Sequence, residues 1–132
     1  MQNIFLIYIG TNEADLEFYA KSVDFVRLSV EEASTREFGA DDVVILTSGT
    51  TPYHADMHNA EIQRVVSLVK QLIERGVRLL AIGVGISALA LAFGGEVEDH
   101  SERGEAGVIE VHRLAPAEGD PVFGDAPETF MA

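Results

Sequence analysis

The residues best suited to chemistry lie in two short stretches of the chain. The first is His54-Ala-Asp56-Met-His58, in which two imidazoles and one carboxylate recur at every second position. In an extended segment alternate side chains lie on the same side, so these three groups could ligate one metal ion. Short spacings of this kind also arise by chance, and a solvated loop leading into a capped helix is the competing interpretation.

The second stretch is Gly83-Val84-Gly85, a tight turn before an apolar segment. Amide groups at the start of a helix favour a carboxylate or a phosphate, so this turn is a candidate anion site. The competing interpretation is that the glycines only permit a sharp turn and close packing of helix on strand. Ser87 follows in a sequence that lacks the second glycine of the Gly-x-Ser-x-Gly nucleophile motif, so we expect it to be a small packing residue.

The composition limits this chemistry further. None of the 132 residues is a cysteine, which excludes disulfides, thiolate metal sites and thiol nucleophiles. Acidic residues outnumber Lys and Arg by 22 to 9, giving a net charge of −13, and such a surface repels nucleic acid phosphates and anionic membranes. The N-terminus lacks the basic start of a signal peptide, so a cytoplasmic protein is expected, and no pattern calls for a cofactor.

One acidic run stands out after the apolar segment. It has no recognised calcium-loop spacing, so we interpret it as a solvated, charged face. Its members are Glu96, Glu98, Asp99, Glu102 and Glu105.

The elements that would position these groups alternate between strand and helix. Short apolar or alternating runs predict strands over 4–9, 23–28, 43–47, 77–82 and 108–114. Helical spacing and capping signals predict helices over 12–21, between Ser29 and Gly39, over 60–75 and over 86–93. The tail from residue 115 is expected to be irregular. Strands separated by helices predict an α/β fold, with a mostly parallel sheet and helices on both faces.

The ends of two helices carry specific signals. Ser29-Val-Glu-Glu32 fits a capping box, Asn59 can cap the helix over 60–75, and Gly76 can end that helix. One face of this helix should be buried, and it carries Ile62, Val65, Val66, Val69, Leu72 and Ile73. Ligands of such sheets bind beyond the carboxyl ends of the strands, where the Gly83 turn is expected.

Three segments, in the same order, resemble class I glutamine amidotransferases. Asp41-Asp-Val-Val-Ile-Leu-Thr-Ser-Gly-Thr-Thr-Pro52 resembles the strand that ends in the family's Ser-Gly-Gly-Pro oxyanion loop. Residues 76–95 resemble the nucleophile elbow, Gly-Ile-Cys-Leu-Gly-(His or Met)-Gln, followed by an apolar helix and Gly-Gly. Arg103-Gly-Glu-Ala-Gly107 is similar to the family's Gly-Glu-x-Gly segment. The resemblance spans nearly the whole chain and implies a flavodoxin-like α/β domain.

Departures from the family pattern indicate that its chemistry is lost. Gly83 stands where the family has its nucleophilic cysteine, and Ser87 replaces the glutamine that helps to bind substrate. The loop at Ser48, Gly49 and Thr50 lacks the second glycine of the oxyanion loop. The family's His-x-Glu, which activates the thiolate, falls beyond the end of this sequence. Because the reaction needs an activated nucleophile together with its base, the resemblance implies a domain without glutaminase activity.

The last residues resemble the Phe-Gly-Leu-Pro stretch that precedes the family's final strands, so the resemblance implies that the C-terminal part of the usual domain is absent. Apolar surface exposed in this way usually finds a partner, so a homodimer or hetero-oligomer is expected. A segment of a longer protein is the alternative.

Our hypothesis is a single truncated domain over 1–132 that acts as a non-catalytic binding, regulatory or assembly subunit. The alternatives are a small metal-dependent enzyme that uses His54, Asp56 and His58, or a structural domain of a larger assembly. The hypothesis includes a vestigial pocket formed by Gly49, Thr50, Gly83, Val84, Gly85 and Ser87.

Overall fold

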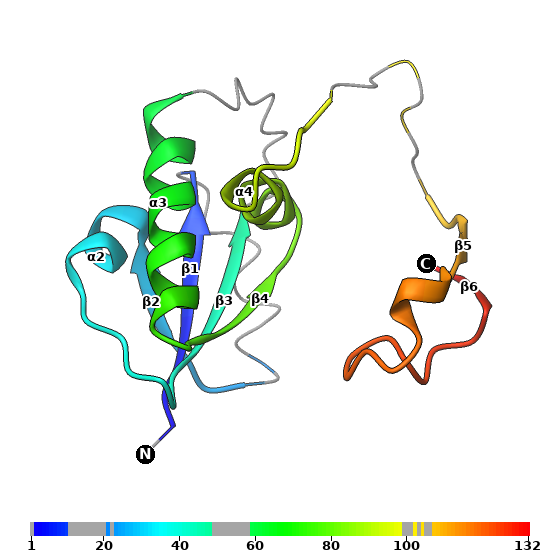
Figure 1. Cartoon of the computed structure of the whole chain (residues 1–132), viewed down its shortest axis with the longest axis horizontal. Coiled ribbons are helices and arrows are strands. Elements are labelled where there is room, and N and C mark those ends of the chain that lie inside the picture. Colours follow the sequence, from blue (N-terminus) through cyan, green and yellow to red (C-terminus); the bar gives the residue numbers. More distant parts are fainter. Residues whose placement is uncertain are drawn as a thin grey trace. The chain divides into compact units, whose positions relative to one another are not determined.

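The computed structural model describes residues 2–10, 21, 23–48, 59–98, 102, 104 and 107–132 (Figure 1). Contacts between its residues divide the chain into two compact units, Met1–Val97 and Glu98–Ala132. A single domain over 1–132 stays a prediction. In the described part of the chain, no helix is long and apolar enough to cross a membrane.

The first unit contains a four-stranded parallel sheet. Its strands are β1 (Ile4–Ile9), β2 (Val26–Ser29), β3 (Val43–Ser48) and β4 (Arg78–Ala81), in the spatial order β2-β1-β3-β4. This is the strand order of flavodoxin-like folds, in which the chain reverses its direction across the sheet between β1 and β3. The predicted fold class, α/β with a mostly parallel sheet, is therefore confirmed.

Three described helices pack together against the sheet. They are α2 (Val30–Thr35), α3 (Ala60–Glu74) and α4 (Val84–Ala92), and α3 contacts both of the others (Figure 1). Right-handed crossovers place α2 and α3 on the same face, because the chain moves in one direction across the sheet from β2 to β4. The helix predicted over 12–21 lies outside the described residues, so coverage of the opposite face stays a prediction.

Local hydrogen bonds define the ends of these helices. The side chain of Ser29 accepts a bond from the Glu32 amide, and the Glu32 carboxylate accepts one from the Ser29 amide, which confirms the capping box. Asn59 Oδ1 accepts from the Ile62 amide at 2.9 Å, as predicted. At the other end of α3, Gly76 has a φ of 73° and closes the helix.

The core lies between the sheet and α3. Phe5, Ile7 and Leu46 from the strands are almost fully buried together with the apolar face of α3. The sequence assigned Ile73 to this face, but Ile73 is 37 % exposed, because it lies in the last turn of α3. Leu68 is buried instead, on the side of α3 that turns toward α2.

The loop before β3 differs from its prediction. The helix expected to continue to Gly39 ends at Thr35, because Arg36 adopts an extended conformation, with φ −90° and ψ 144°. The Arg36 guanidinium then lies 4.5 Å from the centre of the Phe5 ring, and Phe38 packs edge-on against the same ring. Tertiary packing, rather than a C-terminal glycine, ends this helix.

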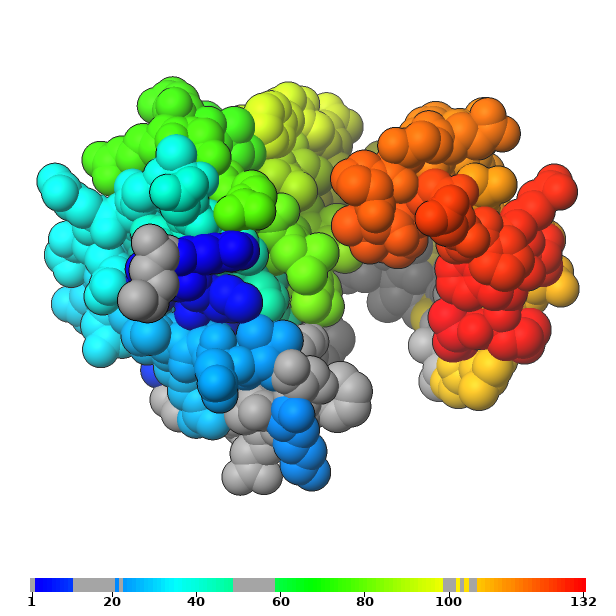
Figure 2. Space-filling model, turned by 90° about the horizontal axis from the view of Figure 1, so that it is seen from below, coloured from blue at the N-terminus to red at the C-terminus, as the bar shows by residue number. Residues whose placement is uncertain are grey.

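A buried carboxylate fastens the amino-terminal end of the sheet. Asp42 accepts hydrogen bonds from the Gly39 amide at 2.8 Å and from Asn3 Nδ2 at 3.1 Å. These two donors hold the pKa of Asp42 below its usual value. Figure 2 shows this end of the molecule from below, with the dark-blue start of β1 between the segments that precede β2 and β3.

The second unit is small and contains an antiparallel pair of strands, β5 (Glu110–His112) and β6 (Thr129–Met131). The strand predicted over 108–114 is thus shorter, and the tail expected to be irregular supplies both β6 and a 3-10 helix, Ala115–Ala117. The Asp120 carboxylate accepts from the amides of Val122 and Phe123, which lowers its pKa and shapes the loop between the strands. Arg113 Nη1 donates to the carbonyl of Gly124 at 2.7 Å and ties this loop to β5.

Candidate functional site

Gly83 forms a sharp turn between β4 and α4. It is the N-cap of α4, with φ 59° and ψ −127°. Residues with a side chain rarely adopt this conformation, whereas glycine does so at little cost. A strained strand-to-helix turn is the geometry that presents a nucleophile in an elbow. The structure therefore places elbow-like geometry at a position that has no side chain.

Ser48, the last residue of β3, lies beside this turn. A Cβ atom built on Gly83 would lie 3.4 Å from Ser48 Oγ, which is ordinary contact distance. The space next to the elbow would thus accept a small side chain, although the backbone conformation disfavours one. Gly49 and Thr50, which follow Ser48 and belong to the predicted vestigial pocket, lie outside the described residues.

Gly85 has a different role from Gly83. A Cβ atom at this position would lie 2.4 Å from the carbonyl oxygen of Leu46, so the absence of a side chain lets α4 sit directly on β3. The Gly85 amide donates to the Ile82 carbonyl at 3.1 Å, and the Ile86 amide donates to the Gly83 carbonyl at 2.9 Å. Since these amides are engaged within the turn, the geometry favours the packing interpretation of Gly85, and anion binding stays a prediction.

Val84 and Ser87 are the other described members of the predicted vestigial pocket. Val84 is half-buried and packs against the core. Ser87 is also half-buried and lies one turn along α4 from the elbow, not at its apex. The structure thus brings Ser48, Gly83 and Gly85 together where β3 and β4 end, and it places Ser87 farther along the helix.

A second group of polar residues lies at the carboxyl ends of β1 and β2. Glu61, in the first turn of α3, accepts a hydrogen bond from the Gly10 amide at 3.1 Å and so links α3 to the end of β1. A cavity of about 220 Å³ lies here. Its walls are formed by Tyr8, Gly10, Ser29, Val30, Glu31, Glu61 and Arg64. The sequence patterns did not identify this cavity or the contact between Glu61 and the end of β1.

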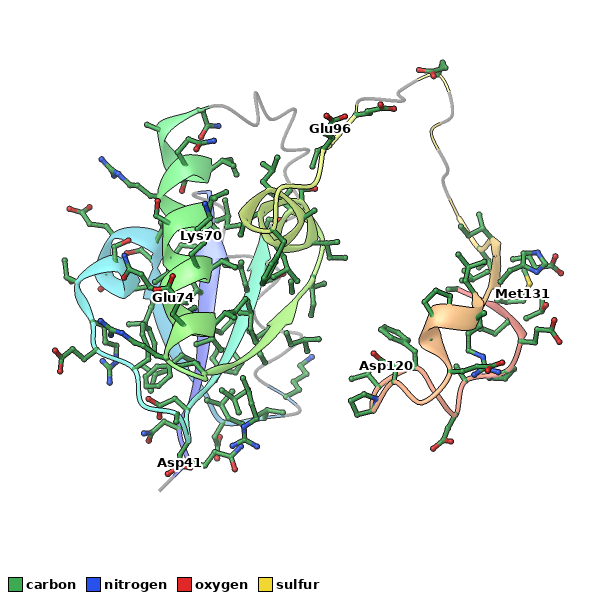
Figure 3. All side chains as sticks on the ribbon, viewed as in Figure 1. Asp41, Lys70, Glu74, Glu96, Asp120 and Met131 are labelled. Atoms are coloured by element: carbon green, nitrogen blue, oxygen red, sulfur yellow. The ribbon has the colours of Figure 1, made fainter. Side chains whose placement is uncertain are left out.

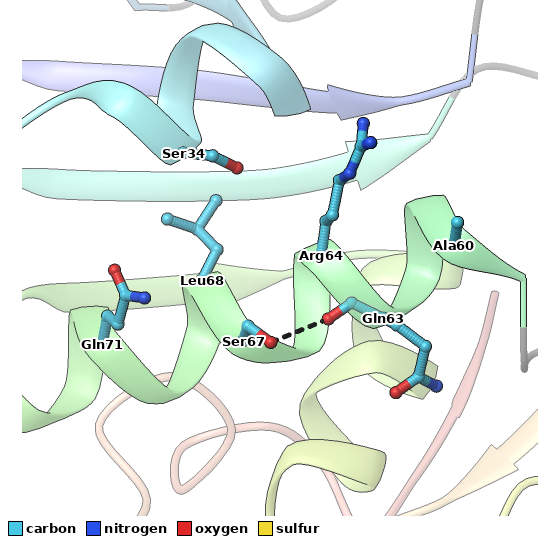
Figure 4. A pocket seen from close by; sticks show the side chains of 7 residues that line it. All are labelled: Ser34, Ala60, Gln63, Arg64, Ser67, Leu68 and Gln71. Atoms are coloured by element: carbon cyan, nitrogen blue, oxygen red, sulfur yellow. Dashed lines mark hydrogen bonds between the residues drawn. The ribbon is translucent and has the colours of Figure 1, made fainter.

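A larger hollow of about 410 Å³ lies between α2 and α3 (Figure 4). Its lining comes mainly from the outward side of α3, and the Ser67 hydroxyl donates to the carbonyl of Gln63 at 3.0 Å. Among its described lining residues there is no carboxylate and no imidazole, the groups most often used in acid–base chemistry. The lining residues are Ser34, Ala60, Gln63, Arg64, Ser67, Leu68 and Gln71.

The predicted metal ligands His54, Asp56 and His58 lie outside the described residues, so that site stays a prediction. Among the residues whose placement is described, no group of three His, Cys, Asp or Glu side chains is arranged to hold a metal ion.

Comparison with solved structures places the fold in a known context. The chain is similar to the crystal structure of a glutamine amidotransferase from Thermotoga maritima, with a TM-score of 0.70 and 17% sequence identity. The match covers 98% of this chain and 58% of the other, so the chain spans little more than half the length of that protein. No protein-family model and no curated protein matches the sequence. The likeness confirms an amidotransferase-like α/β fold, as the sequence motifs predict.

Proposed function

We propose that this chain is a non-catalytic, amidotransferase-like subunit that works by binding a partner protein. The observation that carries the proposal is the turn at Gly83, which combines elbow geometry with the absence of any side chain. A chain without cysteine has no thiol to place there. Amide hydrolysis through a covalent intermediate needs a nucleophile at this apex, and none is present.

Neighbouring hydroxyls are poor substitutes for the missing thiol. Ser87 lies one turn beyond the elbow, and Ser48 lies beside it at the end of β3. A serine needs a general base within hydrogen-bond reach to become a nucleophile. Neither hydroxyl lies at the apex of the turn, which supports a role that does not depend on hydrolysis.

Retention of the scaffold supports a role in binding. The parallel sheet, the elbow and the close approach of α4 to β3 all persist although position 83 is a glycine. Apolar side chains remain exposed on the surface of the same unit, among them Ile86 and Phe93. Exposed apolar surface of this kind is a feature of proteins that associate with others.

Native mass spectrometry of the purified chain, with and without a chelator, tests this proposal against the metal-enzyme alternative. We expect the mass of the polypeptide alone in both conditions. A metal that is bound in stoichiometric amount and removed by the chelator would contradict the proposal. Substitution of His54 or His58 by alanine would then show whether those side chains hold it.

A further inference from the structure

The helix that follows the elbow has an unusual composition. From Val84 to Ala92, α4 contains no charged residue, and apolar side chains lie on all sides of the helix. A helix that is apolar all round normally belongs to a buried position. Among the described elements of this unit, α4 contacts α3, β3 and β4.

Within the first unit, the side of α4 that faces away from α3, β3 and β4 carries large apolar groups. Ile86 is 57 % exposed and Phe93, the C-cap residue, is 68 % exposed. Seven positions separate them, which is two helical turns, so both lie on one side of α4. Leu89 and Ala90 lie between them and are half-buried, and Leu89 also packs against the core. We call these four residues the α4 stripe. Single exposed apolar residues are common on protein surfaces, but an aligned set along one helix is typical of a contact surface.

The α4 stripe ends in a region of negative potential. The last turn of α4 contains no basic residue, so no cation of the helix itself offsets the negative end of the helix dipole. Glu96 is exposed and follows two glycines after the C-cap residue Phe93 (Figure 3). The whole chain also carries a net charge of −13. A matching surface therefore needs apolar groups and, at one end, lysine or arginine.

We infer that the α4 stripe docks a cationic, amphipathic segment of a partner protein. This inference rests on the proposed binding function and names the surface and the chemistry of the partner. A second copy of this chain fits less well, because two bodies of net charge −13 repel each other at long range. A cationic segment is instead attracted to the acidic chain and can then bury its apolar side on the stripe.

A designed peptide provides the test. The probe is an 18-residue, fluorescein-labelled peptide with leucine along one helical face and lysine elsewhere, measured by fluorescence anisotropy with the full chain. Matched peptides carry glutamate in place of lysine, or the same residues in scrambled order. We expect the lysine peptide to bind, with an affinity that falls as salt rises, and the glutamate and scrambled peptides to bind at least about tenfold more weakly.

Variants locate the contact. Phe93→Ser and Ile86→Ser should each weaken binding about tenfold, and Glu96→Gln about threefold. Val26→Ser is the control, because Val26 is 48 % exposed on β2, away from α4. Isoleucine methyl spectra of the unmodified chain provide a second readout: the peptide should shift the Ile86 signal and leave that of the buried Ile62 in place.

Three results would overturn the inference: equal binding by the Phe93 and Val26 variants, equal binding of the lysine and glutamate peptides, or a dimer of the chain that Phe93→Ser dissociates. Each of these results is still compatible with the proposed non-catalytic function if the chain does not hydrolyse glutamine. The opposite case is a bound metal that a chelator removes, observed together with the expected peptide binding. The proposed function would fail, and the docking surface would remain.

Discussion

Replacing Gly85 by alanine should destabilise the protein because the added methyl group has no room. Its carbon would lie 2.4 Å from the carbonyl oxygen of Leu46 and 3.0 Å from the carbonyl carbon. These atoms belong to the backbone of a central strand, so α4 must move instead. Overpacking of this kind costs about 1–3 kcal/mol, and a rigid backbone obstacle favours the upper end. Alanine recovers about 1 kcal/mol through its better helix propensity, which leaves a net loss of about 2 kcal/mol.

Gly39→Ala is the matched control for this prediction. The same methyl group at position 39 would meet only the Asp42 carboxylate, at 3.8 Å, and that glycine has no positive φ. We expect its unfolding free energy to stay within about 0.5 kcal/mol of the parent chain, or to rise slightly. Urea denaturation followed by far-UV circular dichroism gives both values. Equal unfolding midpoints for the two variants would refute the claim that α4 needs a glycine at position 85.

Three other predictions concern single side chains. Asn59→Ala should lower the unfolding free energy by about 1 kcal/mol, because the N-cap hydrogen bond of α3 is lost. Asn59→Asp should retain that hydrogen bond and the stability it provides. An alanine variant as stable as the parent would argue against this cap. Because the pKa of Asp42 is lowered in the folded state, its carboxylate stabilises the fold above the unfolded pKa of about 3.9, and this contribution is lost as pH falls through the lower folded value. Urea midpoints measured from pH 7 to pH 3 should therefore fall more steeply for the parent than for Asp42→Asn, and parallel curves would contradict the assignment. Gly83→Cys should lower the unfolding free energy by about 1–3 kcal/mol through backbone strain. Its thiol should react with a disulfide reagent faster than the thiol of Ser67→Cys, since the start of α4 favours the thiolate. Equal reaction rates would count against an elbow.

The parts of the fold that follow from neighbouring residues could be predicted from the sequence. The capping box at Ser29, the cap at Asn59 and the C-terminal glycine at position 76 act within one helical turn, so their residue types suffice to identify them. Strand β1 was likewise predicted with its observed bounds, Ile4–Ile9, because a short apolar run between polar flanks favours a buried parallel strand.

Features that depend on distant residues could not be predicted in this way. Helix α2 ends at Thr35 because Arg36 and Phe38 both pack against the ring of Phe5. Nothing near residue 36 in the sequence indicates that contact. Strand β6 exists because its main chain pairs with β5, a pairing that short-range patterns in the tail do not encode.

The candidate site shows the same division. The elbow at Gly83 was predicted from its resemblance to a known motif, and its backbone angles fit that motif. The contact that makes Gly85 necessary is with Leu46 on a different strand, and Glu61 meets an amide 51 positions away. Residue types alone identified the glycines at 83 and 85 as a tight turn, but only the packing of helices on strands shows what Gly85 and Glu61 do.

Release of ammonia from glutamine is the most direct test of the central claim that this scaffold has lost its hydrolytic chemistry. The assay compares the unmodified chain with a buffer blank at equal glutamine concentration. We predict that the chain matches the blank, because its elbow has no side chain to act as a nucleophile. Ammonia release by the unmodified chain, in proportion to its concentration, would contradict the account.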